Sequence, residues 1–217
     1  CIGMERIGKR PIPYGDGEDE EARQPRKDSI VLFPTNGVGF GHFTRMYALA
    51  KRWKKRFPSS EVVFFTTMPT LHLLYNHGFP TYHLAGRKKH DNMTASEWNA
   101  MVEEQLSLVF TQHRPTMFVY DGAFPYRGML NALKGQRSLK KVWLRRGMFK
   151  KGTNIPVDSI EHFDLIVRPE DSVPVKPSEL EHGVKTISVP PMVLLDNEEL
   201  IRRNDARKRL GLGQEEK

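Results

Sequence analysis

The sequence lacks the features of disulfide-rich, membrane-spanning or cysteine-ligated metal proteins. It contains a single cysteine, Cys1, which excludes an internal disulfide framework and any metal site built from several cysteines, and which favours an intracellular protein. No stretch approaches the roughly eighteen apolar residues of a membrane span, and the first residues lack the apolar core of a secretory signal. We therefore expect a soluble, cytoplasmic protein.

Large apolar side chains are also scarce near the beginning of the chain. Residues 8–28, GKRPIPYGDGEDEEARQPRKD, combine proline, glycine and dense charge, which predicts a disordered leader over residues 1–28. The remaining residues hold 28 basic and 19 acidic side chains, an excess of nine positive charges, whereas the whole chain carries +8. This excess suits phosphates, anionic lipid headgroups or nucleic acid as partners, although a solvated basic surface is the more usual explanation.

Beyond the leader, short apolar and β-branched runs alternate with longer segments of helical period. This alternation predicts an α/β fold, a Rossmann-like parallel sheet flanked by helices, in one domain over residues 29–192. The predicted strands are 29–33, 61–66, 79–84, 116–120, 140–144 and 163–167. The predicted helices are 41–57, 69–77, 94–114 and 126–133. Thr94 and Glu97 form a capping box at the start of the third helix. Asn204 is predicted to cap a short basic helix that Gly211 ends.

The turn after the first predicted strand, PTNGVGFGHFTR, is rich in glycine but matches neither common nucleotide motif. Gly37, Gly39 and Gly41 give the pattern G-x-G-x-G, and the second strand ends without an acidic residue to hold a ribose, so the dinucleotide fingerprint fails. His42 follows Gly41 in place of the lysine of a P-loop, which argues against ATP chemistry. The glycines allow φ > 0 and lead into a helix N-terminus that favours an anion.

Two acid–base residues follow two predicted strands at the edge where ligands of open α/β sheets gather. His42 lies at the mouth of the loop, where an imidazole can accept a proton from a hydroxyl at neutral pH. The alternative is that His42 only caps the helix or forms a local hydrogen bond. Asp121 can orient His42 and stabilise its imidazolium, or it can cap the next helix. Taken together, the two residues favour an acid–base pair.

Further residues are candidates for substrate contacts. Phe124 and Tyr126 can line a ligand pocket, since aromatic faces stack on sugars or aglycones, or they pack on the core. Arg145 and Arg146 follow the fifth predicted strand and can meet a ligand phosphate, an anionic lipid surface or only solvent. The other histidines show no metal-ligand spacing, so no metal site is expected.

Three segments, NGVGFGHFTRMYALAKRW, VYDG and VLLDNEELIRRNDARKRLGL, together resemble the N-terminal half of a GT-B glycosyltransferase. The likeness is to the family-28 and UDP-glycosyltransferase-like enzymes, and it spans about residues 29–212. It implies an acceptor-binding domain that faces a donor-binding domain, with inverting transfer of a sugar to a hydroxyl acceptor. In this resemblance His42 corresponds to the general base and Asp121 to its acidic partner. The loop that contacts acceptor or donor phosphates corresponds to Asn36, Gly37, Gly39 and Gly41.

The resemblance covers one half of such an enzyme, because the chain contains no donor-binding signature. Residues 193–217 are therefore expected to form a helical linker toward a donor domain, in a longer chain or in a partner chain. The resemblance implies a UDP- or dTDP-sugar as co-substrate. No D-x-D pair follows a strand, which agrees with a GT-B enzyme that needs no metal or other cofactor, and peripheral membrane contact is an option. The rival interpretation is a non-catalytic Rossmann-like module that binds a phosphorylated ligand or an anionic headgroup. Nucleic-acid binding ranks third.

Overall fold

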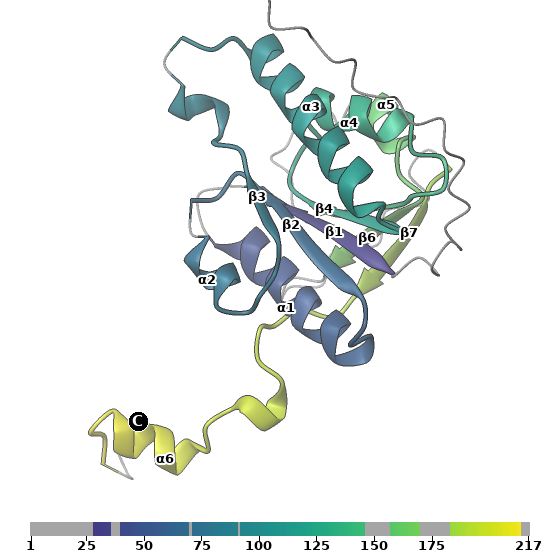
Figure 1. The fold of residues 1–217 in the computed structure, drawn as a ribbon. Helices are drawn as coiled ribbons and strands as arrows, with labels where there is room; N and C mark the ends of the chain where they lie inside the picture. The colour runs from purple at the N-terminus through teal and green to yellow at the C-terminus, as the bar shows by residue number, and fades with distance from the viewer. Residues whose placement is uncertain are drawn as a thin grey trace, which may run out of the picture.

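The structure, a computed structural model, describes residues 28–35, 40–69, 71–90, 92–145, 157–169 and 183–213. These residues form one parallel sheet of seven strands in the order β3-β2-β1-β4-β5-β6-β7 (Figure 1). The strands are β1 (Ser29–Pro34), β2 (Glu61–Thr66), β3 (Thr81–His83), β4 (Met117–Asp121), β5 (Lys140–Leu144), β6 (Leu165–Pro169) and β7 (Lys185–Val189). The predicted α/β class with a Rossmann-like parallel sheet is confirmed.

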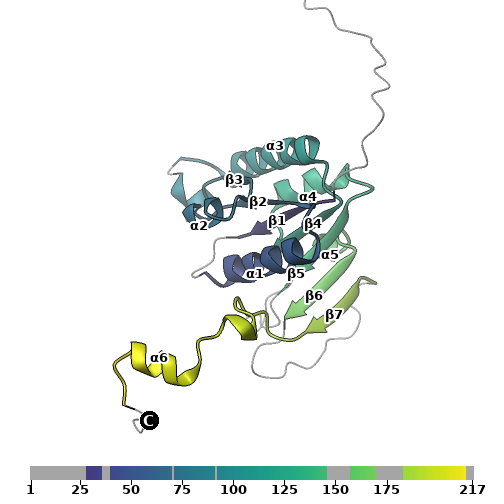
Figure 2. The ribbon, with the colours of Figure 1, turned by 60° about the horizontal axis from the view of Figure 1, so that its bottom comes forward.

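Helices cover both faces of the sheet. They are α1 (Gly41–Arg56), α2 (His72–Tyr75), α3 (Ala95–His113), α4 (Arg127–Lys134), α5 (Val157–Ile160) and α6 (Arg203–Arg209). Figure 2 shows α1 on one side of the sheet and α3 with α4 on the other, while α6 projects away from the sheet. Among the described helices none is long and apolar enough to cross a bilayer.

The central strand β1 is buried on both faces, which explains its unbroken apolar sequence. Ile30 and Leu32 belong to the core beneath α1, whereas Val31 and Phe33 belong to the core beneath α3 and α4. All four side chains are fully buried. A parallel strand covered by helices on both sides needs apolar residues at every position and not at alternate ones.

The predicted boundaries hold best for the buried strands. β2 and β5 have the predicted bounds, while α2 and β3 are shorter than predicted. Gly78, with a φ of 68°, ends the turn after α2, and Pro80 has no amide hydrogen for the ladder, so β3 begins at Thr81. β7 is not among the predicted strands, because this edge strand is largely exposed and lacks a buried pattern.

Helix ends follow the sequence signals in one case and depart from them in another. The capping box of α3 is confirmed, because the Thr94 hydroxyl accepts from the Glu97 amide and the Glu97 carboxylate accepts from the Thr94 amide. The predicted cap of α6 is wrong. Asn204 lies inside the helix, whose N-cap is Arg202 without a side-chain hydrogen bond. Gly211, with a φ of 69°, follows the helix as predicted.

The segment after β7 contacts the basic end of α1. Arg52 donates to the Val193 carbonyl at 2.9 Å and pairs with Asp196 at 2.6 Å. Lys51 pairs with Glu199, also at 2.6 Å, and this hydrogen bond lowers the pKa of the Glu199 carboxyl. These partly exposed pairs join the C-terminal segment to the helix whose other end carries His42.

Candidate active site

The carboxyl ends of β1 and β4 form the centre of the candidate site. The chain runs from β1 to β2 on one side and returns to β4 on the other, so the crossover direction changes between these two strands. Pro34 and Asp121 are paired at the ends of the strands, and α1 begins after the loop that follows β1. Such a switch point is where ligands of open α/β sheets bind.

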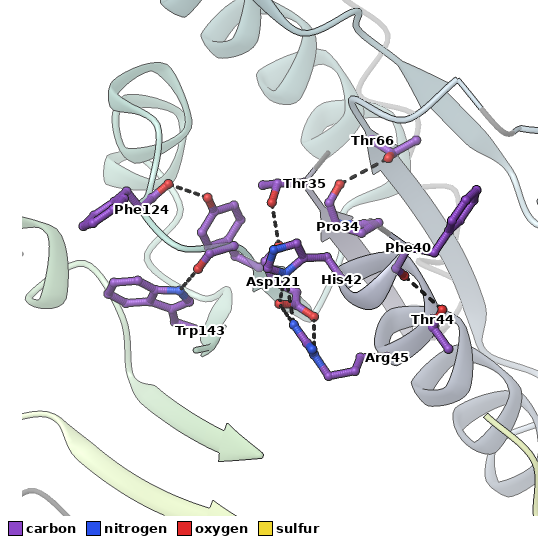
Figure 3. A network of polar contacts seen from close by, with 12 residues as sticks. Pro34, Thr35, Phe40, His42, Thr44, Arg45, Thr66, Asp121, Phe124 and Trp143 are labelled. Atoms are coloured by element: carbon purple, nitrogen blue, oxygen red, sulfur yellow. Dashed lines mark hydrogen bonds and ion pairs between the residues drawn. The ribbon is translucent and has the colours of Figure 1, made fainter. Parts of the chain in front are cut away.

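His42 and Asp121 are in direct contact across this point (Figure 3). The His42 Nδ1 atom lies 2.6 Å from the Asp121 Oδ1 atom. The Asp121 side chain is fully buried, while that of His42 remains 20% exposed. The main chain of Asp121 is fixed as well, because its carbonyl accepts from the Thr35 amide at 3.0 Å and from the Thr35 hydroxyl at 3.2 Å. The structure thus joins two residues that are 79 positions apart in the sequence.

Arg45 is a third member of this cluster, which the sequence analysis did not identify. Its Nε atom donates to Asp121 Oδ2 at 2.9 Å, and its Nη2 atom donates to Oδ1 at 2.8 Å. The guanidinium therefore forms a two-bond fork on the carboxylate. Arg45 lies three positions after His42 on α1, and this spacing places two side chains on one helix face. The GHFTR motif could therefore have predicted that Arg45 lies beside His42.

The geometry selects one tautomer of His42. Nδ1 lies 2.6 Å from Asp121 Oδ1 and 3.0 Å from Arg45 Nη2. A carboxylate oxygen paired with arginine can only accept, so Nδ1 must carry the proton that bridges the shorter distance. Nδ1 and Nη2 are then two donors that converge on one oxygen. In the neutral ring the lone pair then lies on Nε2, which has no hydrogen-bond partner among the described residues.

Neither residue caps a helix, although His42 also has a local neighbour, because its Nδ1 atom lies 3.0 Å from Arg45 Nη2. α4 begins at Arg127 with Tyr126 as its N-cap and no side-chain cap, so Asp121 does not cap that helix. α1 has Phe40 as its N-cap, also without a side-chain cap, and Asp121, which His42 contacts, lies on β4. The contact between His42 and Asp121 therefore caps neither α1 nor α4.

The loop after β4 is held from beneath by two aromatic side chains. The Tyr120 hydroxyl donates to the Phe124 carbonyl, and the Trp143 indole donates to the Gly122 carbonyl at 2.9 Å. Burial raises the pKa of Tyr120 well above its usual value, with smaller contributions from Tyr126 and Asp121, so the hydroxyl stays protonated as a donor. This support fixes the chain on the carboxyl side of Asp121.

The two predicted aromatic contacts differ in exposure. Phe124 keeps 41% of its surface exposed beside the cluster. Tyr126 instead packs on the core, with its ring 4.8 Å from that of Trp98, and burial raises the pKa of its hydroxyl. Phe40, which the sequence analysis passed over, is 54% exposed at the start of α1. Phe40 and Phe124 lie on opposite sides of His42 in Figure 3.

Of the remaining predicted contacts, the structure describes Arg145 and Gly41. Arg145 is only 6% exposed, and its guanidinium lies 5.2 Å from the centre of the Trp143 ring, a cation–π contact. Gly41 is the first residue of α1 and is not among the glycines of positive φ, so the conformational reason given for it is not met. The other predicted contacts, Asn36, Gly37, Gly39 and Arg146, lie outside the described residues.

No group of three or more histidine, cysteine, aspartate or glutamate side chains that could hold a metal occurs in the described part of the chain. The switch point does offer His42, a partly exposed imidazole whose Nδ1 contacts the buried carboxylate that Arg45 pairs with.

No protein-family model and no curated protein sequence matches this chain. Solved structures do match it in fold. A glycosyltransferase from Rickettsia africae has a TM-score of 0.58 at 11% identity, over 88% of this chain and 51% of that one. MurG from Acinetobacter baumannii has a TM-score of 0.53 at 14% identity, over 74% of this chain and 44% of that one. A UDP-N-acetylglucosamine 2-epimerase has a TM-score of 0.50 at 16% identity, over 66% and 42% of the two chains.

Identities this low show the fold and not the activity. The fold is a GT-B-like α/β domain, which this chain shares with these three structures. The chain spans about half or less of the length of each of these structures.

Proposed function

We propose that this chain is the acceptor domain of a glycosyltransferase in which His42 is the general base. The observation that carries the proposal is the contact between His42 and a buried Asp121 at the switch point of a GT-B-like sheet. A histidine whose second nitrogen is held by a carboxylate is the arrangement that activates a hydroxyl nucleophile.

The proposed reaction moves one proton and exchanges one bond. An acceptor hydroxyl gives its proton to His42 Nε2 as its oxygen bonds to the anomeric carbon of the sugar. The bond from that carbon to the phosphate oxygen of a UDP- or dTDP-sugar breaks, and the nucleoside diphosphate leaves with the electron pair. Attack opposite the leaving group inverts the anomeric centre. Asp121 accepts from Nδ1–H throughout and stabilises the imidazolium that forms.

Each half of the enzyme has a separate task in this proposal. The present chain holds the acceptor, for which Phe40 and Phe124 offer exposed aromatic side chains. The donor is bound by a second domain, joined through residues 193–217 or supplied by a partner chain. Charge on the leaving phosphates is met mainly by that second domain, so no metal is required of this chain.

The test is His42→Ala in the complete transferase, with the donor domain present. Loss of the base should lower kcat by about 10²–10⁴-fold while acceptor binding, measured by calorimetry, stays nearly unchanged. His72→Ala, at an exposed position on α2, is the matched control and should leave kcat unchanged. Transfer that persists at the wild-type rate in His42→Ala would end the assignment of the base.

A thermal-shift screen of this chain distinguishes the proposal from a cofactor-binding Rossmann domain. An acceptor domain should gain little stability from UDP, dTDP, NAD or ATP, because the nucleotide belongs to the other half. Clear stabilisation by NAD or ATP, which follows from binding to the folded state, would contradict the acceptor-domain assignment.

A further inference from the structure

Arg45 adds a permanent positive charge to the contact between His42 and Asp121. Its side chain is 19% exposed, whereas the carboxylate that it contacts is fully buried. A buried carboxylate without a partner is strongly destabilising, and a neutral imidazole supplies a donor but no charge. Arg45 therefore supplies the opposite charge that pairs with the Asp121 carboxylate.

The fork also fixes the orientation of the carboxylate. Nε bonds to Oδ2 and Nη2 bonds to Oδ1, so the plane of the carboxylate must follow the plane of the guanidinium. In this orientation Oδ1 faces His42 Nδ1 at 2.6 Å. A lysine at this position would keep the charge but could not form the planar fork.

The state of Asp121 decides which nitrogen of His42 holds the proton. An ionised Asp121 can only accept, so the ring carries its proton on Nδ1 and the lone pair on Nε2. A protonated Asp121 could instead donate to Nδ1, which would move the ring proton to Nε2. In that tautomer Nε2 could not accept a proton from an acceptor hydroxyl.

We propose that Arg45 is a positioning residue that pairs with the Asp121 carboxylate and holds it in plane, and so keeps His42 in the Nδ1–H tautomer with Nε2 free. The inference rests on the proposed function of His42 only for its catalytic consequence. The tautomer itself is a property of the isolated chain and can be measured without any substrate.

The experiment is nitrogen-15 NMR of the 217-residue chain labelled at histidine, with the His42 signals assigned by their absence from His42→Gln. Arg45→Met removes both charge and fork, and Arg45→Lys keeps only the charge. The matched control is Arg52→Met, because Arg52 lies on the same helix and pairs with an aspartate, Asp196, away from His42. Circular dichroism reports whether each variant is folded.

Wild type and Arg52→Met should show a protonated Nδ1 and a bare Nε2. Arg45→Met should show a mixture of tautomers or the reversed tautomer. Arg45→Lys should fold and show a partial shift toward the mixture, which keeps the test valid if Arg45→Met does not fold. A wild-type tautomer pattern in either folded Arg45 variant would overturn the proposal.

Activity of the complete transferase gives a second, separate readout. Loss of an outer partner that orients a functional histidine typically costs about 10–100-fold, so Arg45→Lys should lower kcat by that factor with little change in the KM for the acceptor. A shifted tautomer in Arg45→Lys combined with full activity in His42→Ala would refute the proposed base and leave the role of Arg45 standing. An unshifted tautomer combined with an inactive His42→Ala would refute only the role of Arg45.

Discussion

Gly122 directly follows Asp121, and the structure leaves no space for a side chain there. A Cβ atom built on Gly122 would lie 2.6 Å from Tyr120 Cζ and 2.8 Å from Thr35 Cγ2, and closer still to the Tyr120 hydroxyl. Neither neighbour can move freely. Tyr120 is fully buried and its hydroxyl donates a hydrogen bond to the Phe124 carbonyl, while the Thr35 hydroxyl donates one to the Asp121 carbonyl. Gly122→Ala should therefore displace the residues that fix Asp121.

The expected cost combines two effects. Forcing an extra methyl group into a packed site costs about 1–3 kcal/mol, and loss of the hydrogen bond from Tyr120 adds about 0.5–1.5 kcal/mol. The sum is a loss of about 1.5–4.5 kcal/mol. At about 2–4 °C per kcal/mol for a domain of this size, Tm should fall by about 3–18 °C. In the complete transferase kcat should fall too, because the carboxylate that orients His42 is displaced.

Differential scanning calorimetry and urea unfolding measure this loss. Gly135→Ala is the matched control, because a Cβ there meets nothing within 4 Å and the residue already has a φ of −76°. The control should be neutral or gain about 0.4–1 kcal/mol. Adding Tyr120→Phe to Gly122→Ala removes the nearest clashing atom, so the double variant should be more stable than the sum of the single changes predicts. A Gly122→Ala chain as stable as Gly135→Ala would refute this account of the loop.

Two further changes probe the framework of the site. Gly128→Ala should lower the free energy of unfolding by about 3 kcal/mol, measured by chemical denaturation. The added Cβ would lie 2.8 Å from the carbonyl carbon of Asn99, which is part of the rigid backbone of α3. A stability equal to that of wild type would contradict the close packing of α3 on α4. Hydrogen bonds from the backbone and side chain of Thr94 lower the pKa of Glu97, so the capping box adds stability above the ordinary glutamate pKa and loses it as pH falls through the lowered value. Glu97→Gln keeps a side-chain oxygen that accepts the hydrogen bond but removes the group that titrates. In thermal melts between about pH 5 and pH 3, the variant should therefore lose less stability than wild type. Parallel pH profiles of the two proteins would refute the role given to Glu97.

Local sequence signals predicted the elements whose cause is local. The capping box of Thr94 and Glu97 is a contact between residues three positions apart, and it starts α3 as expected. The buried strands were found because burial on both faces demands continuous apolar residues. Prediction failed where the pattern is weak. β7 is an exposed edge strand, and the cap of α6 was assigned to Asn204 although no side chain caps that helix.

The sequence by itself determined the alternation of strands and helices, the glycine-rich turn before His42 and the position of Asp121 at the end of a strand. It could not determine that these two residues touch, because the order of strands in a parallel sheet depends on packing between distant segments. Pairing of β1 with β4 places Asp121 beside the start of α1, and the pitch of that helix brings Arg45 onto the same carboxylate. The three-residue cluster is therefore a product of the tertiary structure, since a buried charge is tolerated only where the fold supplies its partner.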